Sequence, residues 1–172
     1  MKLVCILLDT REYDQSRFQR HVEKLGIKIE LSNDCSALTP FTAGTHQTNS
    51  ENTIFISGGS CFPSVLKNMI SLQRKDCLVG LDPEWDVSLK QDLYRIAFPV
   101  ILICGGGESS ISRMQSMKYH DRISKSSLVY VNSDPVKILF QGYIPLWVQP
   151  NETVFSLKTD HIFQDRRKTA SA

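Results

Sequence analysis

The sequence lacks the features that would place it in several large protein classes. No apolar run approaches the roughly 18 residues of a membrane span, and the apolar start of the chain is too short for a signal peptide, so we expect no membrane insertion. The five cysteines show no CxxC spacing, which favours reduced thiols in a cytoplasmic protein over a secreted disulfide framework. With a net charge of +2 and no dense basic patch, the chain gives no reason to expect a nucleic-acid partner.

The first strand–helix junction also lacks a phosphate-binding loop. Such a loop needs glycines whose N–H groups cradle phosphates, and a lysine that reaches them. Residues 9–14 read Asp-Thr-Arg-Glu-Tyr-Asp, with neither residue type and with three carboxylates that would repel a triphosphate. We therefore expect no nucleotide cofactor, and no other cofactor is indicated. The four histidines show no HExxH or paired spacing, so we expect no metal site.

What the chain does contain is a central strand–helix–strand pattern. Cys77–Leu81 and residues 99–104 are unbroken apolar runs, as in strands that are buried on both faces of a parallel sheet. Residues 86–96 between them place apolar side chains at roughly helical spacing. An antiparallel pair with an irregular link is the alternative, but a link of this length suits a crossover better. The pattern predicts an α/β fold with a mostly parallel sheet and flanking helices.

Other segments extend this unit toward the N-terminus. Residues 33–52 are rich in Thr, Asn and Ser and are predicted to be a long polar loop. We also expect strands at 3–8, 27–31 (an edge strand), 53–57 and 128–131. Helices are predicted at 13–25 and 64–72, and a third helix, capped by Ser109 or Ser110, contains Ile111, Met114 and Met117. Residues 1–134 would form one domain.

The pattern changes after residue 134. Residues 136–140, 143–148 and 154–157 are short β-like runs separated by Gly and Pro, which predicts a β appendage over residues 135–158. Residues 159–172 are polar and are expected to be a tail.

No catalytic set emerges from the residue types. Three glycines at 105–107 follow a strand, where backbone amides can hold an anion, although a structural turn is favoured. Gly58 and Gly59 also indicate a tight turn. Cys61 lacks an identifiable base for a nucleophile. Asp82 and Glu84 follow a strand end, where α/β sheets bind ligands, but Pro83 favours a plain turn. Trp85 and Trp147 suit a partner contact or a core.

Several short segments resemble a known family. Ser64-Val65, the strand Lys-Asp-Cys-Leu-Val-Gly-Leu-Asp at 75–82 and the turn into the next strand at 93–103 resemble the guanylate kinase-like domain of membrane-associated guanylate kinase homologues (MAGUKs). The run Ser57-Gly58-Gly59 is similar to the CARMA (CARD-containing MAGUK) group. Residues 142–150, Gly-Tyr-Ile-Pro-Leu-Trp-Val-Gln-Pro, resemble the last SH3 strand, which follows the kinase-like domain in that family.

The resemblance implies a P-loop kinase-like module that has lost catalysis and works by protein–protein contact in a cytoplasmic signalling scaffold, held near the membrane through other domains. Its implied partners are an adjoining SH3 domain and signalling proteins, and an unpaired strand also allows a homo-oligomer. The implied interaction residues are Tyr143, Ile144, Trp147 and Val148. The alternative is a nucleotide- or anion-binding enzyme or sensor on a flavodoxin-like or Rossmann-like sheet. A receiver-like domain is a third option, but Ser57 stands where its phosphorylated Asp would be.

Overall fold

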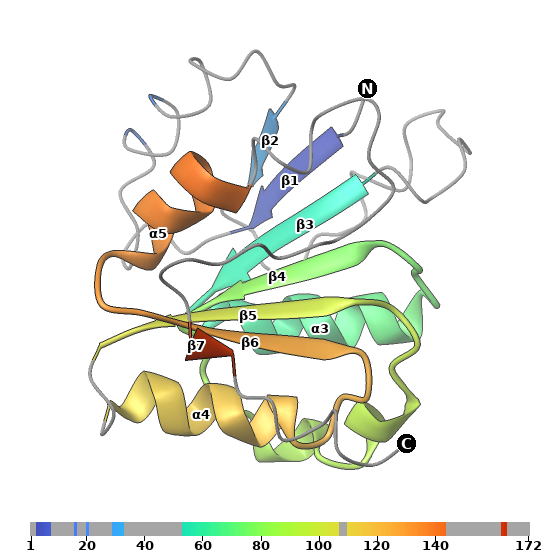
Figure 1. Cartoon of the computed structure of the whole chain (residues 1–172). Coiled ribbons are helices and arrows are strands. Elements are labelled where there is room, and N and C mark those ends of the chain that lie inside the picture. Colours follow the sequence, from blue (N-terminus) through green and yellow to red (C-terminus); the bar gives the residue numbers. More distant parts are fainter. Residues whose placement is uncertain are drawn as a thin grey trace.

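The computed structural model describes residues 3–7, 16, 20, 29–32, 53–106, 110–143 and 163–164. Within them, seven strands form one sheet in the order β2-β1-β3-β4-β5-β6-β7 (Figure 1). The strands are β1 (Leu3–Leu7), β2 (Ile29–Ser32), β3 (Thr53–Gly58), β4 (Cys77–Leu81), β5 (Val100–Gly105), β6 (Ser126–Val131) and β7 (Phe163–Gln164). All neighbours are parallel except β6 and β7. The expected α/β fold with a mostly parallel sheet is therefore confirmed, and β2 lies at an edge as predicted.

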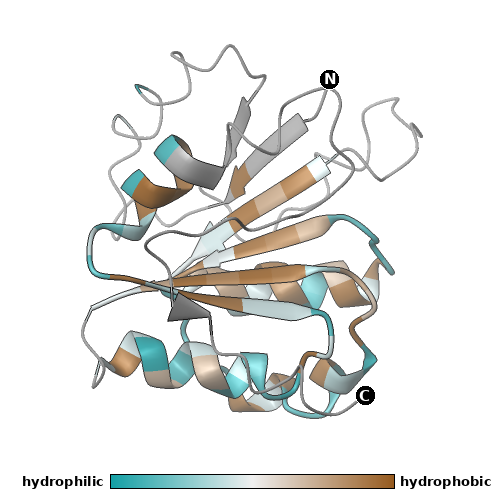
Figure 2. Ribbon diagram, viewed as in Figure 1, coloured by the Kyte–Doolittle hydropathy of each residue, from teal (hydrophilic) through white to brown (hydrophobic). Residues whose placement is uncertain are grey.

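Helices cover both faces of this sheet. Helices α3 (Cys61–Ser71) and α4 (Ile111–His120) lie on one face, and the short helix α5 (Pro135–Ile138) lies on the other (Figure 1). Two hydrophobic clusters follow the alternation of the strands: Ile56, Val79 and Ile103 pack toward α5, whereas Leu78 and Leu102 pack toward α3 and α4. Figure 2 shows β4 and β5 as mainly hydrophobic along their length, as expected for strands covered on both faces.

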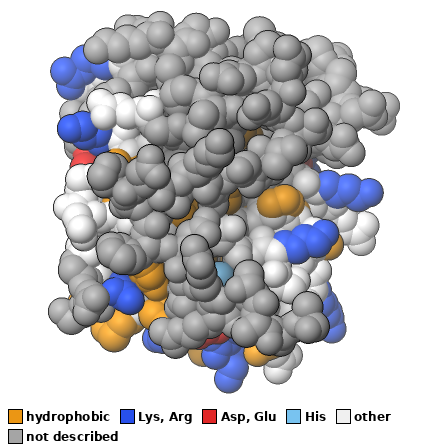
Figure 3. All heavy atoms as spheres, in the orientation of Figure 1, with side chains coloured by type: hydrophobic (Ala, Val, Ile, Leu, Met, Phe, Trp, Pro, Cys, Tyr) orange, Lys and Arg blue, Asp and Glu red, His pale blue; other side chains and the backbone are white. Residues whose placement is uncertain are grey.

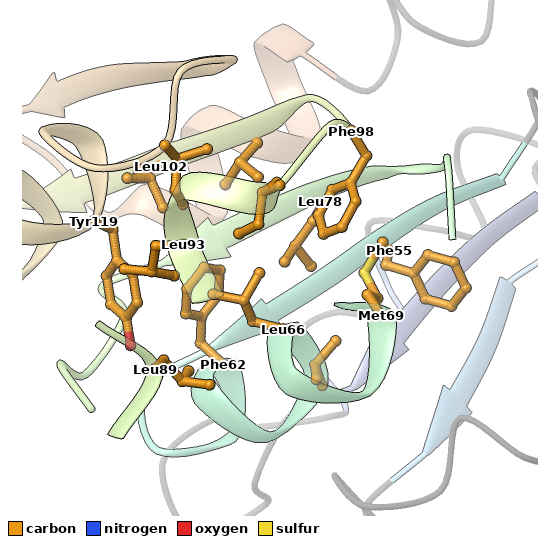
Figure 4. Packing of buried hydrophobic residues seen from close by; sticks show 14 of the residues in the cluster. Phe55, Phe62, Leu66, Met69, Leu78, Leu89, Leu93, Phe98, Leu102 and Tyr119 are labelled. Atoms are coloured by element: carbon orange, nitrogen blue, oxygen red, sulfur yellow. The ribbon is translucent and has the colours of Figure 1, made fainter. Parts of the chain in front are cut away.

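The larger cluster lies between the sheet and α3. Phe62, Leu66 and Met69 come from one side of α3 and meet Phe55 and Leu78 from the strands (Figure 4). Leu66 and Met69 belong to the apolar stripe that predicted a helix here, whereas Phe62 lies before the predicted start. The helix begins at Cys61, three residues before the predicted start at Ser64, because only Gly59 and Ser60 separate it from β3.

Two predictions about local structure are wrong. Residues 86–96 form two short 3₁₀ turns, η2 (Val87–Leu89) and η3 (Asp92–Arg95), rather than one helix. The Asp86 carboxylate caps the first turn by accepting from the Ser88 N–H at 2.8 Å. The link still connects parallel strands, as predicted.

The predicted β-like run at 136–140 is also wrong. Asp134 accepts a hydrogen bond from the Val136 N–H at 3.0 Å and Pro135 occupies the first helical position, so the chain starts α5 there. The π-helical turn η4 (Leu139–Tyr143) follows directly. Ile144, Trp147 and Val148, the other predicted interaction residues, lie outside the described residues. The proposed domain boundary at residue 134 stays a prediction.

No helix within the described ranges combines the length and the apolarity needed to cross a membrane. On the face drawn in Figure 3, basic side chains lie apart from one another among apolar and neutral ones. The predicted helix at 13–25 and the polar loop at 33–52 fall outside the described residues, except that Ser16 and Arg20 have helical backbone.

Candidate functional site

The strand order defines where a ligand site is expected. The chain runs from β1 to β2 on one side and then crosses to β3 on the other side of β1. In doubly wound sheets of the order 2-1-3-4-5, ligands bind outside the carboxyl ends of the strands at the point of reversal, here between β1 and β3. The described residues at this point are the end of β3, with Ser57 in register with Leu7 of β1, and the turn that leads into α3.

Ser57 is the unusual residue at this edge. Its side chain is completely buried, at 0 % exposure, and its hydroxyl has no hydrogen-bond partner among the described residues. Leaving a buried hydroxyl unpaired costs about 1–3 kcal/mol, so such a group calls for an explanation, either a functional role or a bound water or ion. The sequence drew attention to Ser57 as the residue in place of a receiver aspartate and as the start of the Ser57-Gly58-Gly59 run, and nothing in the sequence indicates that it lacks a partner.

The neighbours of Ser57 fix the direction of its side chain. Ser57 is in register with Gly80 of β4, and residues paired in register point to the same face of a sheet. A Cβ on Gly80 would lie 2.5 Å from Cε2 of Phe62 in the first turn of α3. The Ser57 hydroxyl therefore points to the α3 side of the sheet, beneath the first turn of the helix.

The two glycines that follow Ser57 form the predicted tight turn. Gly59 has φ +51°, which an L side chain rarely adopts. Its N–H donates to the Leu81 carbonyl at 3.0 Å, and its carbonyl accepts from the Glu84 N–H at 3.1 Å. The turn therefore joins the ends of β3 and β4 and holds the start of α3 over them.

Asp82 directly follows β4 at the same edge of the sheet. It is a non-glycine residue with φ +43°, and its Oδ1 accepts from the Gly105 N–H at 2.8 Å and from the Ser112 hydroxyl. The glycine-rich loop after β5 was a candidate anion site, but here a carboxylate already occupies one of its amide donors and adds a negative charge. This contact favours a structural turn at Gly105 over an anion nest.

Ser110 and Arg113 show how the same loop leads into α4. The Ser110 hydroxyl donates to the Gly105 carbonyl at 3.3 Å and accepts from the Arg113 N–H at 3.1 Å. This is the predicted cap of α4. The Arg113 guanidinium lies 4.1 Å from the centre of the Tyr130 ring, a stacking contact within the fold.

The cysteines near this edge are not nucleophiles. Burial raises the pKa of the Cys104 thiol to about 11, so it is a neutral group that donates weakly to the Val129 carbonyl at 3.6 Å. Cys61 is disulfide-bonded, whereas Cys77 and Cys104 are free. The expectation of reduced cysteines therefore does not hold for Cys61. The spacing of the cysteines did not indicate that Cys61 forms a disulfide bond.

The remaining candidates serve the fold. His120 Nδ1 lies 2.9 Å from the Ser126 hydroxyl and its side chain is buried. Trp85 packs edge-to-face on Tyr119 with ring centres 4.9 Å apart, and the Tyr119 hydroxyl donates to the Glu84 carbonyl at 2.7 Å. Burial raises the pKa of Tyr119 far above its usual value. Within the part of the chain that the structure describes, no three His, Cys, Asp or Glu residues gather as metal ligands.

Comparison with solved structures shows that another protein shares this fold. A solved structure described as a predicted CIB-like hydrolase from Thermoplasma acidophilum is similar to this chain with a TM-score of 0.56 and 14 % sequence identity, over 81 % of this chain and 80 % of that one. No family model and no curated protein matches the sequence.

The resemblance to a MAGUK guanylate kinase-like domain is therefore wrong. The fold is shared with a protein described as a hydrolase, and nothing among the family models or curated proteins supports a MAGUK. The strand order begins 2-1-3-4-5, which is the flavodoxin-like order. The resemblance depended on short apolar strands and turns that many parallel sheets contain. The interpretation as a non-catalytic scaffold, and with it the MAGUK, SH3 and pseudokinase description, fails for the same reason. The strand order agrees with the flavodoxin-like sheet of the alternative, an enzyme or sensor.

Proposed function

We propose that this chain is an enzyme that binds a small molecule at the carboxyl edge of its sheet, between β1 and β3. The observation that carries the proposal is the strand order, which reverses at this point. The turn at Gly59 adds support, because it brings the start of α3 to the same edge.

Hydrolysis is the first reaction to test. The similar solved structure is described as a predicted hydrolase, and the likeness itself concerns the fold alone. The described residues do not supply a complete catalytic set. We therefore propose hydrolysis of a small molecule at the carboxyl edge of the sheet.

The test combines turnover with a map of the site. The purified chain is assayed for turnover of p-nitrophenyl phosphate and p-nitrophenyl acetate. Any substrate or product that binds is then titrated into the protein while the NMR signals of the backbone amides are recorded. We expect turnover of one ester class, and the largest shifts at Gly58, Gly59 and Ser60. Shifts concentrated at the opposite edge, around Asp76 and Lys125, would place the site elsewhere.

A matched pair of variants tests whether turnover depends on the carboxyl edge rather than on another part of the surface. Ser60 and Ser71 are both exposed and flank the two ends of α3. Ser60→Tyr places a large ring at the carboxyl edge, so we expect turnover to fall at least about 10-fold, the effect of a blocked contact worth 1.4 kcal/mol. Ser71→Tyr places the same ring at the far end of the helix and should leave turnover unchanged. Equal activity of both variants would contradict the proposed site.

A further inference from the structure

The disulfide bond of Cys61 lies at the start of α3, next to the proposed ligand site. Cys77 and Cys104 are free, and the sequence contains five cysteines, so the partner of Cys61 within the chain is Cys5 or Cys35. Cys5 belongs to β1, and Cys35 closely follows the end of β2 in the sequence. Either bond therefore links the start of α3 to β1 or to the segment after β2.

The strand order places this bond across the strand reversal between β1 and β3. On one side of the reversal, α3 follows β3 directly, and Phe62 and Leu66 pack in one cluster with Leu78 of β4. On the other side lie β1 and β2. A disulfide keeps its two Cα atoms within about 7 Å of each other. The bond therefore fixes the distance between the start of α3 and the β1–β2 side of the site.

The burial of Cys61 indicates that the bond persists in the folded protein. Cys61 is 2 % exposed, and reduction of a disulfide requires a thiolate to attack a sulfur atom directly. The bond forms when two thiols lose two protons and two electrons to an oxidant, such as oxygen or another disulfide. Once α3 has packed on the sheet, thiols in solution no longer reach the Cys61 sulfur.

We infer that the Cys61 disulfide is a permanent crosslink that positions the start of α3 against the β1–β2 side of the ligand site. This inference rests on the proposed function, because it names what holds the two sides of the same site together. Cys61 is a positioning residue: it acts through the place of α3, and its sulfur takes no part in the reaction.

A map of the bond tests the crosslink directly. The protein is denatured in the presence of an alkylating agent, digested without reductant and analysed by mass spectrometry. We expect the Cys61 peptide joined to that of Cys5 or Cys35, and alkylated Cys77 and Cys104. Prior treatment of the folded protein with dithiothreitol should leave the bond intact, whereas the same treatment in urea should break it. An alkylated Cys61, a link to another chain, or ready reduction in the folded protein would overturn the inference.

Stability tests what the bond contributes. Cys61→Ala should lower the melting temperature by about 5–15 °C, the effect of losing a typical disulfide in a chain of this size. Cys77→Ala also removes a buried sulfur, but no crosslink, and should lower it less. Wild-type protein refolded with reductant should melt like Cys61→Ala, which provides the comparison if that variant folds poorly. Equal losses in Cys61→Ala and Cys77→Ala would contradict a stabilising crosslink.

Hydrogen exchange distinguishes positioning of α3 from general stabilisation. In Cys61→Ala, the amides of Val65 and Leu66 near the start of α3 should exchange at least about 10-fold faster, and those of Met69 and Ile70 near its end should change less. Equal acceleration along the helix would mean that the bond only stabilises the fold, and would overturn the positioning role.

Turnover connects the crosslink to the site. With the p-nitrophenyl ester that the chain hydrolyses, Cys61→Ala should raise KM about 10-fold well below its melting temperature, with kcat within about twofold of the wild type. Cys77→Ala should change neither, and an unchanged KM in Cys61→Ala would contradict positioning of the site. If the map shows no bond while Ser60→Tyr still lowers turnover, only this inference fails. If neither ester is hydrolysed, the proposed function fails, and the map and hydrogen exchange still decide the crosslink.

Discussion

At the scale of single residues, the ion pair between Arg74 and Asp76 stabilises a buried carboxylate just before β4. Arg74 Nε lies 2.7 Å from Asp76 Oδ2, and the Asp76 side chain is fully buried. Removing Arg74 leaves that carboxylate without its cation, so we expect Arg74→Ala to lower the free energy of unfolding by at most about 3–5 kcal/mol. Urea unfolding measures the change. Arg95→Ala, at an exposed arginine, is the control and should change stability by less than about 0.5 kcal/mol.

The pH dependence of the stability of Arg74→Ala tests whether the buried charge of Asp76 causes the loss of stability. Burial raises the pKa of Asp76, although Arg74 opposes the shift. A carboxyl whose folded pKa lies above its unfolded value binds protons more tightly when folded, so its contribution to stability falls as pH rises through that range. Without Arg74 the folded pKa rises further. The deficit of Arg74→Ala relative to wild type should therefore shrink as pH is lowered from 7 toward 4. A deficit that does not change with pH would mean that lost packing of Arg74 on Phe55, 5.2 Å away, is the cause.

At the scale of elements, the contact between Phe62 and Gly80 decides how closely α3 approaches the sheet. A Cβ on Gly80 would lie 2.5 and 2.9 Å from two ring atoms of Phe62. We expect Gly80→Ala to destabilise the protein by about 1–3 kcal/mol through overpacking. Phe62→Leu removes the ring atoms, so the double variant should be more stable than the sum of the two single effects predicts. Strict additivity in thermal or urea unfolding would show that the ring is not what excludes the Cβ.

The elements also show how far pattern reasoning reaches. Periodicity predicted α4 correctly, but Ile111 and Met114 are 68 % and 52 % exposed, and the helix buries Tyr119 and His120 instead. A pattern of apolar residues locates a helix, whereas the face that it buries depends on which strands it packs against. Residues 136–140 were misread because Asp134 and Pro135 provide helix-starting chemistry just before a β-branched run.

At the scale of the whole molecule, the class of the fold was predictable and the site was not. The unbroken apolar runs at β4 and β5 indicate strands buried on both faces, and the parallel sheet follows from them. The order of the strands depends on long-range pairing that no local pattern encodes, and it is this order that locates the ligand edge. The unpaired hydroxyl of Ser57 likewise exists only once β3, β4 and α3 are assembled.

The stability of the whole sheet depends on its central strand. Val79 in β4 is fully buried and is in register with Ile56 on one side and Ile101 on the other. Val79→Asp buries a charge in a cluster of apolar side chains, which costs several kcal/mol, comparable to the whole stability of many domains. We expect loss of the cooperative thermal transition in circular dichroism. Val87→Asp, the same change at a valine that is 71 % exposed, should melt like the wild type. If Val79→Asp also melts like the wild type, β4 does not lie at the centre of a sheet covered on both faces, and the strand reversal that locates the ligand site would have to be placed again.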